Sequence, residues 1–132
     1  KVCASLTDIP GSSATFERGF VTYSNAAKIE MLDVDPATLA AHGAVSEEVA
    51  REMALGARKA ASADVAVAIS GIAGPGGSEH KPEGRVCYAV ATPAEVWAET
   101  VEHGALGREK VREAATNHAL TLLHHALLDR LT

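Results

Sequence analysis

The stretch VAVAISGIAGPGG at residues 65–77 indicates the fold class more clearly than any other part of this sequence. Residues 65–69 form a short, unbroken apolar run, which is typical of a β-strand covered on both faces. A glycine-rich loop then begins at Ser70 and extends to Gly84. In open α/β sheets, ligands bind in the crevice at the carboxyl ends of such strands. The stretch therefore predicts an α/β domain with a small-molecule site beside this loop.

The rest of the sequence supplies helices and further strands on either side of this stretch. We expect helices at residues 2–9, 25–32, 36–42 and 46–61 and from residue 108 onward, and strands at residues 16–24, 65–69, 86–91 and 96–102. The last predicted strand alternates residue by residue, which favours an antiparallel partner with one wetter face. Together these elements predict a mixed sheet with helices on both sides.

Length and composition limit the possible functions. The 132 residues fit one domain, and the balance of 47% hydrophobic and 22% charged residues is ordinary for a globular protein. The formal net charge of −5 argues against nucleic acid or an anionic membrane as a partner. Recognition of a phosphate would therefore be local, made by one or two arginines and backbone N–H groups. Aromatic residues make up only 4%, and we expect a homo-oligomer in which neighbouring chains help to cover the core.

The cysteines and the chain start bear on the cellular compartment. Cys3 and Cys87 form neither a disulfide framework nor a paired metal-ligand spacing, and we expect free thiols in a reducing cytoplasm. No apolar run approaches the roughly 20 residues needed to span a bilayer. The chain begins at Lys1 without a methionine, so we expect that a native segment precedes it.

The first candidate for chemistry is the segment from Tyr23 to Lys28, at a predicted strand end and helix start. If Asn25 caps the helix, Lys28 lies in its first turn, where the helix dipole disfavours an ammonium group. Partial burial would lower the pKa of the amine further, so that it could serve as a general base near neutral pH. The alternative is an exposed helix lysine beside a tyrosine that packs in the sheet.

The second candidate is the loop that follows the buried strand. Its glycines would let backbone N–H groups approach an oxyanion or a phosphate. The loop matches neither the P-loop nor the dinucleotide pattern, because its glycine spacing differs and no Gly-Lys-Ser/Thr follows. A plain surface loop between strands is the alternative. The candidate contacts are Ser70, Gly71, Gly74, Gly76 and Gly77.

The third candidate is the start of the last helix. Arg108 and Arg112 share one face there, and arginine near a helix N-terminus is unfavourable unless an anion joins it. Solvated arginines paired with neighbouring glutamates are the alternative. The six histidines do not predict a metal, since no carboxylate spacing completes a site around them.

Several separated motifs, in order, closely resemble the CinA C-terminal domain family. They are TDIPGSS at residues 7–13, FERGFVTYSN at 16–25 with Lys28, HGAVS at 42–46, SGIAGP at 70–75 and KPEG at 81–84. The similarity runs nearly end to end. The resemblance implies a three-layer α/β/α fold of the anticodon-binding-domain type. It also implies a nicotinamide mononucleotide amidohydrolase of pyridine-nucleotide recycling, with a small nucleotide substrate and neither a metal nor an organic cofactor.

The resemblance also assigns roles to residues: Lys28 would be the general base of a Ser/Lys dyad and Tyr23 an assisting group, and Ser70 stands where family members carry Ser or Thr. The other candidate substrate contacts, which the resemblance does not assign, are Ser24, the loop glycines, Arg108 and Arg112. In the family, a Glu-Ser-Cys-Thr-Gly-Gly segment with the nucleophilic serine precedes the helix in which this chain begins. That segment, with a helix and a strand before it, is absent from the 132 residues, so we expect the chain alone to lack activity. A non-catalytic nucleotide-binding regulatory module of a larger protein is the alternative function.

Overall fold

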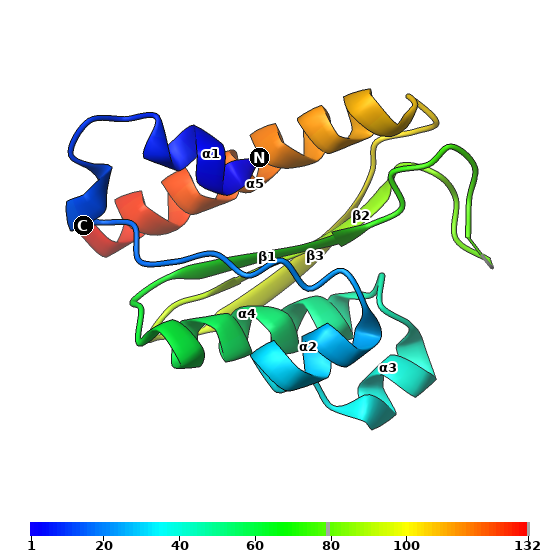
Figure 1. The fold of residues 1–132 in the computed structure, drawn as a ribbon, viewed down its shortest axis with the longest axis horizontal. Coiled ribbons are helices and arrows are strands. Elements are labelled where there is room, and N and C mark those ends of the chain that lie inside the picture. Colours follow the sequence, from blue (N-terminus) through cyan, green and yellow to red (C-terminus); the bar gives the residue numbers. More distant parts are fainter. Residues whose placement is uncertain (79, 132) are drawn as a thin grey trace.

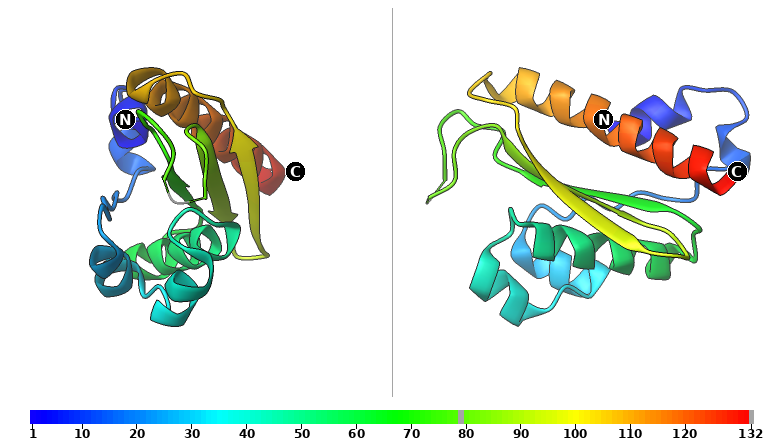
Figure 2. Two further views of the ribbon diagram at one scale, coloured as in Figure 1. Left: turned by 90° about the vertical axis from the view of Figure 1, so that its right-hand side faces the viewer. Right: turned by 180° about the vertical axis from the view of Figure 1, so that it is seen from behind.

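The computed structural model describes residues 1–78 and 80–131, and it arranges them in three layers (Figure 1). A three-stranded sheet lies in the middle, with α1 and α5 on one side and α2, α3 and α4 on the other, as the end-on view in Figure 2 shows. The helices are α1 (Val2–Thr7), the 3-10 turn η1 (Ser12–Ala14), α2 (Asn25–Leu32), α3 (Pro36–His42), α4 (Glu47–Ala61) and α5 (Arg108–Leu131); the strands are β1 (Ala66–Gly71), β2 (Arg85–Ala91) and β3 (Val96–Glu102). The α/β layering predicted from the sequence is confirmed.

The sheet is antiparallel throughout, in the order β1-β2-β3. The glycine-rich loop joins β1 to β2 as a long hairpin, so that Ser70 pairs with Cys87 and Gly71 with Val86. Residues 86–91 of the central strand β2 are all buried, whereas β3 alternates between partly buried and exposed positions for most of its length. This alternation places β3 at an edge with one wetter face, as its sequence predicted.

Successive side chains of a strand point to opposite faces, so the sheet builds two cores. One core lies against α4 and includes Val49, Ala50, Met53, Ala68, Cys87 and Ala89. The other lies against α5 and includes Val86, Tyr88, Val90, Val111, Ala119 and Leu122. The sheet is therefore covered on both faces. Within the described residues, no helix is long and apolar enough to cross a bilayer.

The predicted strand at residues 16–24 does not form. Without it, the sheet has only the antiparallel pairs β1–β2 and β2–β3 in the described part of the chain, so the prediction of a mixed sheet is wrong. Residues 16–23 run as an extended segment beside β1 (Figure 1), but no backbone hydrogen bond joins residues 17–23 to the sheet in the described part of the chain. The β-forming side chains at Phe20, Val21 and Tyr23 favour an extended backbone. A ladder also requires an adjacent strand, and β1 lies across a groove from this segment.

Side-chain caps fix the helices near the site. Ser24, not Asn25, is the N-cap of α2, since its Oγ accepts a hydrogen bond from the Ala27 N–H at 3.0 Å. Asp35 caps α3 through the Ala37 N–H, and Ser46 caps α4 through the Val49 N–H. Because the cap of α2 is one residue earlier than expected, Lys28 lies one position deeper in the helix.

Candidate functional site

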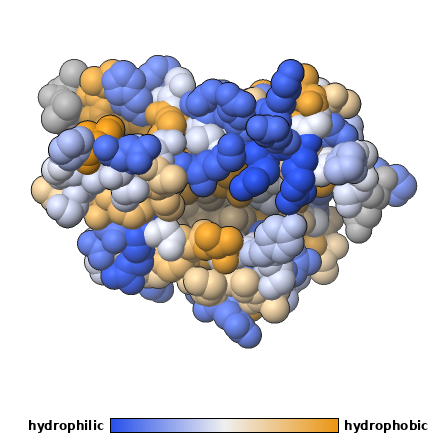
Figure 3. Space-filling model, turned by 45° about the horizontal axis from the view of Figure 1, so that its top comes forward, coloured by the Kyte–Doolittle hydropathy of each residue, from blue (hydrophilic) through white to orange (hydrophobic). Residues whose placement is uncertain are grey.

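A groove of about 970 Å³ runs between the extended segment 15–23 and the edge of β1. Its walls come from α1 and η1 with the loop between them, from α2 and α4, and from the C-terminal part of α5. Most of its lining is apolar, including Phe16, Phe20, Val67 and Ile69. Figure 3 shows hydrophobic surface in a hollow on this side of the molecule, bordered by hydrophilic residues. The groove is therefore an apolar channel in which an ionised group would be poorly solvated.

Lys28 lines this groove although it is only 7% exposed. Its Nζ donates a hydrogen bond to the carbonyl oxygen of Thr22 at 2.7 Å. Burial lowers the pKa of the Lys28 amine, because desolvation disfavours the charged form. The structure thus rules out the simple exposed helix lysine and places an amine of lowered pKa beside the backbone that carries Tyr23.

Tyr23, Arg108 and Gly74 come together from three separate elements. Arg108 Nη1 donates to the Gly74 carbonyl at 3.2 Å, and its Nη2 donates to the Tyr23 hydroxyl at 3.5 Å. Tyr23 is 85% exposed and does not pack within the sheet. A polar edge made by a phenol, a guanidinium and the glycine-rich loop therefore forms where the chain leaves the groove.

The side chain of Glu83 fastens the same loop from the other direction. Its Oε1 accepts a hydrogen bond from the Gly76 N–H at 2.5 Å, and its Oε2 accepts one from the Gly107 N–H at 2.9 Å. Gly74 has φ +88°, and a Cβ added there would lie 2.5 Å from Glu83 Cδ. The positive φ at position 74 favours glycine, and a larger residue would also displace this carboxylate.

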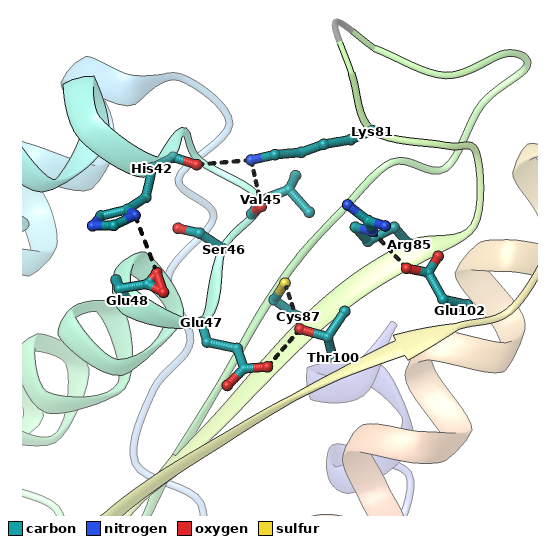
Figure 4. A pocket seen from close by; sticks show the side chains of 10 residues that line it. All are labelled: His42, Val45, Ser46, Glu47, Glu48, Lys81, Arg85, Cys87, Thr100 and Glu102. Carbon is teal, nitrogen blue, oxygen red and sulfur yellow. Dashed lines mark hydrogen bonds and ion pairs between the residues drawn. The ribbon is translucent and has the colours of Figure 1, made fainter.

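A second, shallower pocket of about 330 Å³ lies on the α4 face of the sheet (Figure 4). Here Lys81 Nζ donates to the carbonyl oxygens of His42 and Val45 at 2.8 and 2.6 Å. The Ser70 hydroxyl donates to the Ala44 carbonyl at 2.8 Å, and the Ser46 hydroxyl donates to the Gly43 carbonyl. Side chains therefore satisfy four successive carbonyls between α3 and α4 and tie this turn to the glycine-rich loop.

Comparison with known proteins identifies the family. The model of the CinA C-terminal domain matches residues 1–127. The chain belongs to the CinA C-terminal domain family. A protein named nicotinamide-nucleotide amidohydrolase PncC, from Escherichia coli strain K12, is 56% identical over 128 residues, which cover 96% of this chain and 78% of that protein.

Other relatives of this CinA domain differ in length. A putative competence-damage inducible protein of Symbiobacterium thermophilum is 53% identical over 134 residues, but the chain spans only 31% of its length. Among solved structures, the competence/damage inducible protein CihA of Agrobacterium tumefaciens gives a TM-score of 0.90 at 44% identity, covering 94% of this chain and 76% of that one. A CinA superfamily protein of Klebsiella pneumoniae 700603 gives a TM-score of 0.92 at 35% identity, covering 97% and 80%.

The remaining candidate residues of this CinA domain serve the fold or lie apart. Ser24 and Ser70 use their hydroxyl groups in the α2 cap and in the bond to Ala44. A Cβ at Gly71 would meet the Val86 side chain at 2.7 Å, and one at Gly77 would meet the Lys81 carbonyl at 2.5 Å, so close packing explains these two glycines. Arg112 is exposed one turn beyond Arg108 on α5.

Glu83 and Lys81 lie outside the set of site residues predicted from the sequence. Both stand in the KPEG motif at residues 81–84, which is one of the motifs that carry the family resemblance and was therefore a usable signal. The partners themselves are backbone groups of the loop, of the α3–α4 turn and of the residue before α5. Because nearly every residue carries the same backbone N–H and C=O groups, the sequence does not show which of them a side chain will bond to. In the described part of the chain, no cluster of three or more His, Cys, Asp or Glu side chains could hold a metal ion.

Proposed function

We propose that this chain is the catalytic domain of a nicotinamide-nucleotide amidohydrolase, which converts nicotinamide mononucleotide to nicotinic acid mononucleotide and ammonia. One observation carries the proposal: a buried lysine of lowered pKa lines a large groove next to a polar edge. A relative of the same family, 56% identical, is named for this activity. Hydrolysis of an amide needs a base of this kind to activate a nucleophile.

In the proposed mechanism, Lys28 is the general base and a serine hydroxyl is the nucleophile. The neutral amine takes the serine proton as the serine oxygen attacks the carboxamide carbon of the nicotinamide ring. The resulting ammonium then returns a proton to the departing nitrogen, which leaves as ammonia. Water hydrolyses the acyl-enzyme to the free carboxylate and restores the serine. Because Lys28 must be uncharged to begin, the rate should rise with pH through the lowered pKa of its amine.

A segment N-terminal to Lys1 is proposed to supply the serine. The chain spans 78% of the Escherichia coli relative, so that protein has residues beyond the matched region. Lys28 lines a groove of about 970 Å³ bounded by the extended segment 15–23 and by the edge of β1 that pairs with no strand among the described residues. An incoming stretch of chain can bond to such an edge and bury apolar side chains in the groove. The serine would then approach the amine from within the groove.

Arg108 and Tyr23 are proposed to bind the polar part of the substrate. The Arg108 guanidinium has five N–H donors, and its contacts with Gly74 and Tyr23 leave others for a phosphate. The apolar groove would receive the aromatic ring. Arg112, one turn further along the same helix, is a candidate for a second, weaker phosphate contact.

The test is an ammonia-release assay with nicotinamide mononucleotide, on protein that includes the segment upstream of Lys1. Lys28→Ala is expected to lower turnover by at least about 100-fold, the range of a lost general base. Lys110→Ala, at an exposed position of α5, is the matched control and should retain wild-type turnover. Near wild-type ammonia release by Lys28→Ala would reject the assignment. Tight binding of the nucleotide by wild type without ammonia release would instead favour a regulatory binding module.

A further inference from the structure

We propose that Glu83 is a positioning residue, which holds the glycine-rich loop and the start of α5 so that Arg108 meets the substrate's phosphate. This inference rests on the proposed function, and it assigns a role to a side chain outside the set predicted from the sequence. Glu83 itself does not line the groove: it holds Gly107, next to Arg108, and Arg108 contacts Tyr23 at the groove.

The carboxylate closes a ring of contacts between two segments. Glu83 accepts N–H bonds from Gly76 in the loop and from Gly107, the residue directly before α5. Arg108, the first residue of α5, returns a bond to the Gly74 carbonyl in the same loop. Two side chains therefore link the loop to the start of α5: the carboxylate of Glu83 and the guanidinium of Arg108.

The charge of Glu83 matters because both of its partners are backbone donors. A carboxylate can accept two N–H bonds, one at each oxygen, and such charge-assisted bonds are about twice as strong as neutral ones. Gly107 also lies at the positive end of the α5 dipole, which favours a negative charge. Glutamine at this position would present an NH₂ group to one of the two donors. One of the bonds would then be lost with little change in side-chain size.

Glu83 also decides which groups remain for a ligand. The Gly76 and Gly107 N–H groups would otherwise attract an external anion, and the internal carboxylate occupies both. The guanidinium of Arg108 then remains for an anion at this edge, directed by its bonds to Gly74 and Tyr23. Loss of the Glu83 bonds should therefore misplace Arg108 and weaken phosphate binding, with little effect on the chemistry at Lys28.

Steady-state kinetics of Glu83→Gln test the proposal, on the same upstream-extended protein. Two substrates are compared: nicotinamide mononucleotide and nicotinamide riboside, which lacks the phosphate. We expect KM for the mononucleotide to rise about tenfold, which corresponds to the loss of one hydrogen bond between Arg108 and the phosphate. The value of kcat should stay within about twofold of wild type. KM for the riboside should stay at its wild-type value. Glu109→Gln makes the same charge change at an exposed position of α5 and should leave both substrates unaffected.

Several results would overturn the proposal. These are an equal change in KM for both substrates, a fall in kcat at constant KM, or unchanged kinetics. If the wild-type protein releases no ammonia, the proposed function fails, and amide hydrogen exchange decides the positioning role alone. The Gly76 and Gly107 amides should then exchange faster in Glu83→Gln than in Glu109→Gln. Equal exchange in the two variants would reject the role of Glu83.

Discussion

The two sides of the sheet bury polar side chains in opposite ways. On the α5 side, Tyr88 is fully buried, its hydroxyl shares a hydrogen bond of 2.6 Å with His103 Nε2, and the centre of its ring lies 4.5 Å from that of His118. His118 in turn pairs with Glu99 at 2.5 Å. On the other side, Lys28 has one hydrogen bond, to a backbone carbonyl, and lines an open groove. A polar group buried in a closed network stabilises the fold, whereas one at a groove wall is available for chemistry.

The ionisation of the two groups supports this distinction. Burial raises the pKa of the Tyr88 phenol, with a smaller contribution from Glu99, so the phenol stays protonated and takes part in the network as a neutral hydroxyl. Burial lowers the pKa of the Lys28 amine toward neutral pH, where an uncharged amine can act as a general base. The same physical cause, desolvation, thus removes one group from acid–base chemistry and prepares the other for it. Mutations on the two sides should therefore act on different properties.

The largest effect is expected from Tyr88→Ala, which should lower the free energy of unfolding by about 3–5 kcal/mol, as for other large buried aromatic residues. The variant loses a ring at the centre of the α5 core and leaves His103 without its partner. Urea unfolding followed by circular dichroism measures the change. Tyr88→Phe keeps the ring and should cost only about 1 kcal/mol, the net value of one hydrogen bond. A loss below 1 kcal/mol for Tyr88→Ala would show that this cluster is not a structural core.

The substitution Lys28→Met should have the opposite profile, with a small effect on stability. The loss of the bond to Thr22 costs about 1 kcal/mol, and relief of the buried amine's desolvation offsets part of that cost. The same urea titration should place Lys28→Met within about 1 kcal/mol of wild type, although it lacks the proposed base. A loss comparable to that of Tyr88→Ala would make Lys28 a structural residue and remove the contrast between the two sides.

The sequence could predict the elements because their signals are local. Helices follow Asp35, Ser46 and Gly107, and the apolar run at 65–69 overlaps β1, since caps and hydrophobic periodicity act over a few residues. The segment 16–24 was misassigned because its residue types favour an extended backbone, whereas pairing depends on which strand lies beside it. The antiparallel β1–β2 pairing likewise depends on the long hairpin between them.

The candidate site could be predicted only in part. Lys28 and Tyr23 stand five residues apart at a helix start, and Arg108 begins a helix, so local reasoning could find each of them. The contact of Arg108 with Tyr23 joins residues 85 positions apart, and no spacing rule predicts it. The roles of Ser70 and Glu83 depend on backbone groups of distant segments. Ser70 was therefore expected to face a ligand, although its hydroxyl bonds to the Ala44 carbonyl.

The smallest expected effect is a loss of stability in acid, caused by His103. Burial, together with the nearby His118, lowers the pKa of His103 from its ordinary value of 6.5. As the pH falls through 6.5, the unfolded chain therefore binds a proton at this position before the folded chain does. The contribution of His103 to the free energy of unfolding should decline from that point down to its folded pKa and stay constant below it.

Urea titrations between pH 7.5 and 5 measure this effect. It is limited by the partial exposure of His103, and it has to be separated from the titration of other groups in the same network. His118 and Glu99 face the same space from α5 and β3, and Tyr88 stays protonated throughout this range. His103→Gln keeps a hydrogen-bond acceptor for the Tyr88 hydroxyl and removes the titrating ring, so its stability should fall less between these two pH values than that of wild type. Equal slopes for the two proteins would show that His103 is protonated in the folded state as easily as in the unfolded chain, and would contradict its desolvation within this network.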